Sequence, residues 1–372
     1  MVIFYYPMHF NRGNGNENND FIKPFVSTLV NAEIPFKIIE EPDFKVKYPR
    51  NKKAIQFDFW FKVVIAIRKL IPLNLFSNFE AREQWLGKTL RYLTFNYFKA
   101  EVVFTLSNSM AGFWRGYNPK ARIIDYQHGI IDQNQIGFFE KSTAPEHITY
   151  NKKEVAVWGN SFKKFFENAG GYYKNNVHVL GYFKSITDNI SLLKHNRIVF
   201  SLQFLPGFGE KLNQEMYDKL EDVLRDLDAL PNIHQPEVIL RHHPRHENII
   251  SVKKLIERFN FVKLMDSSSI LIPLDYSMHI TFFSTVAFEM AMQGVPSYFL
   301  TTTNLNQGKK IFIEEYQYPG LNLTKVAEQW MMYCTDEDKW LADCKRVKEW
   351  SSKFFEPFNE KLLLEIVNGN KK

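Results

Sequence analysis

Three short clusters of residues carry side chains that could bind a phosphorylated ligand or move a proton. They are residues 125–129, 240–246 and 281–289, and each follows a short apolar run of the kind that forms a buried strand. Ligands of open parallel sheets bind outside the C-terminal ends of the strands. The three clusters are therefore the candidate functional residues.

The cluster at residues 125–129, Asp-Tyr-Gln-His-Gly, combines a histidine with a glycine. His128 can exchange a proton near neutral pH, and Gly129 permits a tight turn or a close backbone approach. The alternative is a hydrogen-bonded structural histidine at the strand end. As a functional site, the cluster offers His128 as a base, with Asp125 or Asp132 as further candidates.

The cluster at residues 240–246, Leu-Arg-His-His-Pro-Arg-His, concentrates five basic or titratable side chains at a strand end. Pro244 favours extended backbone at His243. We therefore expect Arg241 and His243 at the strand edge, where cationic groups can neutralise a phosphate. The alternative is a solvated basic loop. No carboxylate or thiolate spacing accompanies the histidines, so no metal site is expected.

The cluster at residues 281–289, Thr-Phe-Phe-Ser-Thr-Val-Ala-Phe-Glu, predicts the start of a helix after a strand. Ser284 and Thr285 would open this helix, and its free backbone N–H groups would face an anion such as a diphosphate. Glu289 follows about one turn later, where its carboxylate could accept hydrogen bonds from both hydroxyls of a ribose. The alternative is a capped helix with a structural glutamate.

Apolar runs alternate with amphipathic stretches along the whole chain, which predicts an α/β protein with parallel sheets. Strands are expected at 2–6, 36–39, 100–106, 121–126, 154–158, 177–180, 198–202, 237–240, 261–264 and 278–282. Helices are expected at 20–31, 108–116, 209–227, 249–259 and 284–293. A further helix would take Ser161 as its N-cap and end at Gly170.

The 372 residues are enough for two domains, each with its own core. The pattern predicts a doubly wound domain at 1–184, a linker at 185–196 and a second doubly wound domain at 197–350. Pro357 interrupts the last helical region. We therefore expect residues 351–372 to form a C-terminal helix that returns to the first domain.

The charge balance favours anionic partners. Lysine and arginine number 47 against 41 acids, for a formal charge of +6, which suits nucleotide phosphates or acidic lipid. The bases are scattered and no nucleic-acid-binding motif occurs, so nucleic acid is not an expected partner. Cys334 and Cys344 lack the spacing of a disulfide framework or a zinc site. With no signal-peptide pattern at the N-terminus, a cytoplasmic location is expected.

Residues 56–76 are the most membrane-like segment of the chain. Asp58, Lys62 and Arg68 interrupt this segment and Pro72 breaks it, so it is not expected to span a bilayer. It could instead lie on an anionic membrane as an interfacial helix, peripheral to the inner membrane. The alternative is a helix that packs on the core of the first domain. In either case its apolar face would comprise Phe57, Trp60, Phe61, Val64, Ile65 and Ile67.

Together the three clusters resemble the GT-B glycosyltransferases, in which two Rossmann-like domains face a central cleft and the C-terminal domain holds most of the nucleotide-sugar donor. Residues 284–296 are similar to the family's small-residue helix start followed by Glu and then Gly-x-Pro. The His128-Gly129 and His243-Pro244 pairs are similar to those of bacterial transferases that build teichoic acids, capsules and lipopolysaccharide. The acidic-acidic-Gly motif of bacterial sialyltransferases does not occur here.

The resemblance implies transfer of a sugar from a nucleotide sugar to a surface-glycan or lipid-linked acceptor, with neither a metal nor a cofactor. It assigns the donor to Arg241, His243, Pro244, Ser284, Thr285 and Glu289. The acceptor side would comprise His9, Asn11, Gln127 and Gly129, beside the candidate bases His128, Asp125 and Asp132, with His243 assisting catalysis.

Three other functions fit the same clusters. A polyol-phosphate transferase of the CDP-glycerol type would share both histidine pairs but attack a phosphorus atom. A nucleotide-sugar epimerase would use the same architecture. A binding subunit could retain the fold without any activity, because a fold alone does not supply a reaction.

Overall fold

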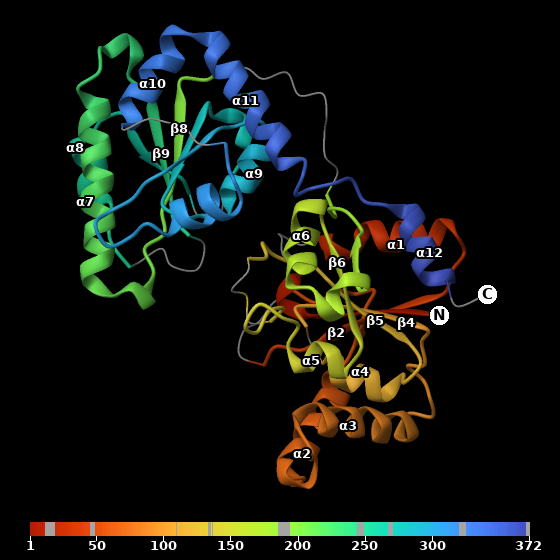
Figure 1. Cartoon of the computed structure of the whole chain (residues 1–372). Coiled ribbons are helices and arrows are strands. Elements are labelled where there is room, and N and C mark those ends of the chain that lie inside the picture. Colours follow the sequence, from red (N-terminus) through yellow and green to blue (C-terminus); the bar gives the residue numbers. More distant parts are fainter. Residues whose placement is uncertain are drawn as a thin grey trace. The chain divides into compact units, whose positions relative to one another are not determined.

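The structure, a computed structural model, describes residues 1–11, 19–44, 49–108, 110–132, 135, 137–184, 194–243, 249–266, 271–319 and 325–369. The chain divides into two compact units. Unit 1 comprises residues 1–186 and 354–372, and unit 2 comprises residues 187–353. Each unit is built on one parallel sheet with helices packed on it (Figure 1).

The sheet of unit 1 has 7 strands in the order β3-β2-β1-β4-β5-β6-β7. All neighbouring pairs are parallel. The strands are β1 (Val2–Pro7), β2 (Phe36–Glu41), β3 (Ile55–Gln56), β4 (Val102–Leu106), β5 (Arg122–Tyr126), β6 (Lys153–Val157) and β7 (Val177–Val179). The direction of winding reverses between β1 and β4. The loops after these two strands therefore flank the position where such sheets bind ligands.

Helices cover both faces of this sheet. They are α1 (Lys23–Asn31), α2 (Asp58–Leu70), α3 (Phe79–Leu93), α4 (Ala111–Tyr117), α5 (Glu146–Tyr150), α6 (Asn160–Ala169) and α12 (Glu360–Asn368). Successive side chains of β1 point to opposite faces. Ile3 and Tyr5 join the core formed with α2, α3 and α4, whereas the ring of Phe4 lies 5.3 Å from that of Phe25 on α1. Burial on both faces explains why β1 is a continuous apolar run.

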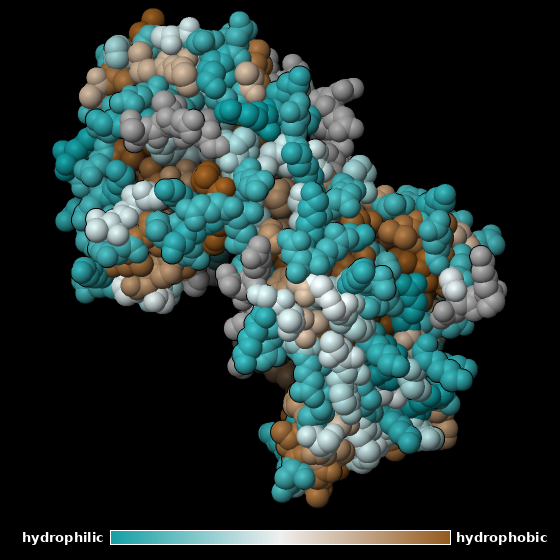
Figure 2. Space-filling view, in the orientation of Figure 1, coloured by the Kyte–Doolittle hydropathy of each residue, from teal (hydrophilic) through white to brown (hydrophobic). Residues whose placement is uncertain are grey.

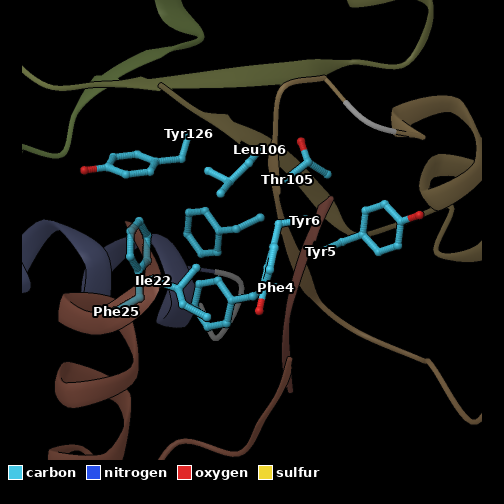
Figure 3. Close-up of a pocket in the computed structure, with 9 residues that line it drawn as sticks. Phe4, Tyr5, Tyr6, Ile22, Phe25, Thr105, Leu106 and Tyr126 are labelled. Atoms are coloured by element: carbon cyan, nitrogen blue, oxygen red, sulfur yellow. The ribbon is translucent and has the colours of Figure 1, made fainter. Parts of the chain in front are cut away.

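Aromatic rings fill the core on the face of the sheet that packs against α1. The ring of Phe104 lies 5.4 Å from Phe4 and 5.1 Å from Phe25, which in turn lies 4.9 Å from Tyr126. Figure 3 shows Phe4, Phe25 and Tyr126 around a cavity of about 10 Å³. That volume holds about one water molecule. The rings are therefore part of the core, not a ligand site, and they account for some of the 16% aromatic content.

Two glycines allow α3 and α4 to pack closely, as seen in Figure 1. A Cβ atom on Gly87 would lie 2.0 Å from the carbonyl oxygen of Phe113. One on Gly116 would lie 1.9 Å from the carbonyl oxygen of Gln84. The two helix backbones therefore approach more closely than any larger residue permits.

The sheet of unit 2 has 5 parallel strands in the order β10-β9-β8-β11-β12. Its winding reverses between β8 and β11. The strands are β8 (Arg197–Ser201), β9 (Glu237–Arg241), β10 (Val262–Leu264), β11 (Met278–Thr281) and β12 (Ser297–Phe299). The helices are α7 (Gly209–Asp228), α8 (Lys253–Arg258), α9 (Val286–Met292), α10 (Val326–Thr335) and α11 (Glu337–Ser351).

Every strand expected from the sequence is present, with ends that differ by no more than two residues. Two short strands, β3 and β12, were not predicted from the sequence. The predicted start of α6 was wrong, because Gly159 occupies the N-cap position and Ser161 lies inside the helix. Gly170 ends α6 as expected, with a φ of 65° that favours glycine.

Candidate functional site

The C-terminal edge of the unit 2 sheet brings together residues that are far apart in the sequence. Ser201 pairs with Arg241 on one side and with Thr281 on the other, so the three residues form one row across the strand ends. Neighbouring strands lie about 4.8 Å apart, which puts Arg241 and Thr281 about 10 Å from each other along this row. This row lies at the reversal point of the sheet, where a ligand is expected.

Gln203 fixes the loop that leaves this row toward α9. Its Oε1 accepts hydrogen bonds from the Thr281 hydroxyl at 3.0 Å and from the Phe283 backbone N–H at 2.7 Å. The side chain of Gln203 is buried. Because both donors converge on one buried oxygen, the loop has a defined shape before any ligand binds.

Ser284 is also held inside this loop. Its backbone N–H donates to the Thr281 hydroxyl at 3.1 Å, and its own hydroxyl accepts from the Val286 N–H at 3.3 Å. The Ala287 N–H donates to the Ser284 carbonyl at 3.1 Å. The expectation of a helix opening at Ser284 with free amides was therefore wrong. The helix begins at Val286, and the amides of Phe283, Ser284 and Val286 are bonded within the loop.

Thr285 and Glu289 are the exposed members of the third cluster. Glu289 lies on α9, one turn beyond Thr285. In the part of the chain that the structure describes, the Glu289 carboxylate has neither an ion pair nor a hydrogen bond. It is therefore available to accept hydrogen bonds from a ligand.

The basic cluster begins at the end of β9. Arg241, His242 and His243 are half-buried at the sheet edge. The Leu202 N–H donates to the Arg241 carbonyl at 2.8 Å, which continues the pairing of β8 and β9 to the last residue. Pro244 and the two residues after it lie outside the described residues. The guanidinium of Arg241 is thus the positive charge that the structure places in the row.

In unit 1, Asp125 is completely buried at the end of β5. Its Oδ1 accepts from the Thr105 hydroxyl and from the Asn108 N–H, each at 2.8 Å. Ser107 and Asn108 have φ values of 61° and 57°, a left-handed conformation that costs energy in residues other than glycine. These contacts let Asp125 stabilise the turn after β4, and its burial keeps its carboxylate away from an acceptor in solvent.

A buried lysine completes this network. Lys153 of β6 is fully buried, and its Nζ donates to the side-chain oxygen of Asn108. Burial lowers the pKa of Lys153 to about 8, while the nearby Asp125 and Glu80 carboxylates oppose that change. Asp125 and Lys153, which are ionisable groups of opposite charge, therefore both bond to Asn108 in the turn after β4.

The remaining predicted acceptor-side residues at the end of β5 differ in their exposure. Gln127 is buried, and its Nε2 donates to the Gly129 carbonyl at 2.8 Å while its Oε1 accepts from the Trp158 N–H at 2.9 Å. His128 and Asp132 are half-buried. Gly129 has no positive φ, and a Cβ there would meet nothing within 4 Å. The backbone at this position therefore does not use the freedom that glycine permits.

The loop after β1 contributes one ring contact to this region. The ring of Phe10 lies 5.4 Å from that of His128 and 4.4 Å from that of His9. The structure thus brings both His9 and His128 into contact with one aromatic ring. Asn11, by contrast, is buried, and its Nδ2 donates to Glu40 at 2.5 Å and to the Pro49 carbonyl at 2.8 Å. Asn11 therefore anchors the loop.

No family profile and no curated protein sequence matches the chain. Solved structures, by contrast, are similar to the chain. The wall teichoic acid polymerase TagF soaked with CDPG is similar with a TM-score of 0.53 and 12% identity, over 99% of this chain and 87% of that one. The lipopolysaccharide outer core galactosyltransferase WaaB has a TM-score of 0.52 and 13% identity, over 100% of both chains. S. aureus MnaA with UDP has a TM-score of 0.52 and 10% identity, over 100% of this chain and 96% of that one.

The chain has the GT-B fold. The two parallel sheets and the order of their strands agree with this assignment. Among the described residues of this GT-B chain, no helix has the length and apolar character needed to cross a bilayer.

A histidine near the row of strand ends in this GT-B chain was not predicted from the sequence. His279 of β11 is completely buried, with its Nδ1 2.8 Å from the Ser297 hydroxyl and its Nε2 2.9 Å from the Ser201 hydroxyl. Burial lowers the pKa of His279 to about 3, and the charge of Arg241 acts in the same direction. A neutral ring thus ties β11 to β8 and β12. An isolated histidine inside an apolar run gave no sign of this role.

Unit 2 is expected to become less stable as the pH is lowered, because His279 is buried in its neutral form. The pKa of a histidine in an unfolded chain is about 6.5, and that of His279 in the folded protein is about 3. At a pH between these two values, the unfolded state binds a proton at His279 that the folded state does not. The free energy of unfolding should therefore drop by up to about 1.4 kcal/mol per pH unit as pH falls through this window, and no such loss occurs above it. Urea unfolding at pH 7.5, 6.5 and 5.5 measures this slope. In His279→Gln the slope should be shallower, and equal slopes would contradict the assignment.

A second missed histidine, His147 of α5, lies in unit 1. Its Nε2 is 3.1 Å from the Gly137 carbonyl oxygen. A carbonyl only accepts, so Nε2 carries the hydrogen. Burial first, and then the charge of Lys153, lower the pKa of His147. The ring is therefore neutral at pH 7, with Nδ1 as its acceptor atom.

Proposed function

We propose that this GT-B chain is a glycosyltransferase that moves a sugar from a nucleotide-sugar donor to a surface-glycan or lipid-linked acceptor. The observation that carries the proposal is the row of Arg241, Ser201 and Thr281 at the reversal point of the unit 2 sheet. Arg241 supplies positive charge for the donor's phosphates. The exposed carboxylate of Glu289 suits the hydroxyls of the ribose.

In the proposed reaction, an acceptor hydroxyl attacks the anomeric carbon of the donor sugar, and the bond to the nucleotide's phosphate oxygen breaks. Arg241 and His243 stabilise the negative charge that develops on the leaving phosphate, so the reaction needs no metal. The proton of the attacking hydroxyl goes to His128 or Asp132, both half-buried. Asp125 instead positions the turn after β4, because its carboxylate is buried and bonded.

Product analysis separates this proposal from its rivals. The protein is incubated with uridine, cytidine and guanosine diphosphate sugars and with CDP-glycerol, each with and without EDTA. A glycosyltransferase releases the nucleotide and transfers the sugar, and EDTA leaves its rate unchanged. A polyol-phosphate transferase releases CMP from CDP-glycerol, an epimerase changes the sugar and releases no nucleotide, and a binding subunit does neither. Any of these three results would overturn the proposal.

Glu289→Ala is expected to weaken nucleotide binding by tenfold or more. A hydrogen bond to a charged group contributes about 1.5–3 kcal/mol, and about 1.4 kcal/mol corresponds to a factor of ten. Isothermal titration calorimetry with the best nucleotide from the screen measures the change. Glu328→Ala in α10 of the same unit serves as the control and should bind like the parent. Equal affinity in Glu289→Ala would reject the ribose contact.

We also infer that unit 1 contacts an anionic membrane from the cytoplasmic side. Most of the apolar face expected on α2 packs on the core, but other side chains are exposed: Phe59 by 66%, Leu70 by 80% and Leu75 by 69%. Lys62 and Lys69 are exposed on the same helix. Figure 2 shows apolar surface where Figure 1 places α2. Exposed apolar side chains beside lysines favour the surface of an anionic bilayer.

Vesicle flotation tests the membrane contact. The protein should float with vesicles that contain phosphatidylglycerol and remain below neutral phosphatidylcholine vesicles. Exchanging two exposed leucines, in Leu70→Glu/Leu75→Glu, should reduce binding at least tenfold, since a buried leucine contributes about 1.5–3 kcal/mol. Ile233→Glu alters an equally exposed residue of unit 2 and should float like the parent. A parent protein that does not float would refute the inference.

A further inference from the structure

A pocket in unit 1 lies apart from the three clusters found in the sequence. It has a volume of about 260 Å³ and is bounded by α2, α3, α4 and α5 and by the ends of β2 and β4. At roughly 30 Å³ for each water molecule, the pocket has room for about eight or nine waters, which is close to the size of one pyranose ring with its hydroxyls. Its lining includes Glu41, Phe61, Phe79, Glu80, His147 and Asn151.

Asn151 fixes the polar side of this pocket. It is completely buried, and its Nδ2 donates to Oε2 of Glu80 at 2.5 Å and to the His147 carbonyl at 2.8 Å. Its Oδ1 accepts from the Gln84 side chain at 2.9 Å. The Glu80 carboxylate and the segment that bears His147 are thus held in place by one amide.

The polar groups of this pocket are mainly acceptors. Glu41 and Glu80 offer carboxylate oxygens, and the neutral ring of His147 offers Nδ1. Among the described lining residues Arg68 is the cation other than histidine, and its Nε and Nη2 both donate to the Glu83 carboxylate. An anionic ligand would therefore meet carboxylates without a free positive charge to offset them. Hydroxyl groups, which donate hydrogen bonds, suit this lining.

The apolar part of the lining suits the same ligand. The rings of Phe61 and Phe79 line the pocket, and Phe79 is 48% exposed, so it lies at the opening. A sugar ring carries hydroxyls at its edge and C–H groups on its faces. It can therefore bond to the carboxylates and the imidazole while a face contacts an aromatic side chain.

We propose that this pocket is a binding site for a neutral pyranose. That the sugar belongs to the acceptor rests on the proposed function, but the pocket itself does not. Glu80 and His147 accept hydrogen bonds from its hydroxyls, and Phe79 contacts its apolar face. Asn108, in the turn after β4, also lines the pocket, so this turn forms part of the proposed sugar site.

Saturation-transfer NMR on the full chain tests this proposal. The probes are methyl glucoside, methyl galactoside and glucuronic acid. The two neutral glycosides should bind with measurable affinity, and glucuronic acid should not. Glu80→Gln and Phe79→Ala should each weaken binding about tenfold or more. Trp85→Ala removes another exposed ring of α3 that does not line the pocket, and it should bind like the parent.

Each outcome distinguishes the pocket from the transferase proposal. If no neutral glycoside binds, or if glucuronic acid binds more tightly, the pyranose site is refuted, whatever the protein does with a nucleotide sugar. If Glu80→Gln and Phe79→Ala stay folded by circular dichroism yet bind like the parent, the site is also refuted. If the neutral glycosides bind as expected while no nucleotide binds, the pocket stands and the transferase proposal fails.

Discussion

Arg241→Ala is expected to lower the turnover number about a hundredfold or more, the effect of removing one group that stabilises charge in a transition state. Arg241 lies in the row of strand ends with Ser201 and Thr281, and its charge reaches His279. In the proposed reaction, the same charge faces the nucleotide's phosphate, on which negative charge develops as its bond to the sugar breaks. Steady-state kinetics with the best donor measures kcat and KM separately.

The position of Arg241 also defines its control. Arg225→Ala removes an exposed arginine of α7 that pairs with Glu221 on the same helix. Exposed pairs of this kind contribute little to stability, so this variant should keep the parent's turnover. His243→Ala should resemble Arg241→Ala, since both are assigned to the leaving phosphate. If Arg241→Ala remains folded and turns over normally, the phosphate role of the row is wrong.

Much of the fold could be predicted because its strands are buried on both faces. Such strands read as continuous apolar runs, and parallel strands alternate with helices along the chain. Strands of two or three residues give no such signal, which explains why Ile55–Gln56 and Ser297–Phe299 were missed. They depend on pairing with a longer neighbour and not on their own composition.

The candidate site could be predicted only as separate strand ends. The sequence placed Arg241 and Ser284 after apolar runs, but their relation depends on β8 lying between β9 and β11. The use of the Ser284 amide also depends on a long-range partner, because Gln203 and Thr281 fix that loop across 78 residues of sequence. The free helix start was therefore a local prediction that tertiary hydrogen bonds overturned.

Burial of charged residues was the other feature that the sequence did not disclose. Asp125 looked like a candidate base because it lies beside His128 in the chain. The structure turns it toward Thr105 and Asn108 and gives it Lys153 as a buried neighbour. These contacts come from neighbouring strands, so only the order of the sheet reveals that Asp125 is buried and bonded to the turn after β4.

Glu40→Ala is expected to reduce the free energy of unfolding of unit 1 by about 3 kcal/mol, because it removes the charged acceptor of the buried Asn51 N–H and Asn11 amide, while Arg50 keeps Asp58 as a partner. Glu40 is fully buried at the end of β2. Its Oε1 lies 2.9 Å from Nε of Arg50, while its Oε2 accepts from Asn11 at 2.5 Å and from the Asn51 N–H at 3.0 Å. Chemical denaturation measures the loss.

The same substitution also tests how the loop after β1 is held, since Asn11 bonds to Glu40 and the adjacent Phe10 contacts His128. Glu40→Gln keeps the side-chain shape and one carbonyl acceptor, so it should lose less stability than Glu40→Ala. Glu167→Ala, at an exposed site on α6, should change stability by no more than about 0.5 kcal/mol. A Glu40→Ala protein as stable as Glu167→Ala would mean that this buried network does not hold the loop.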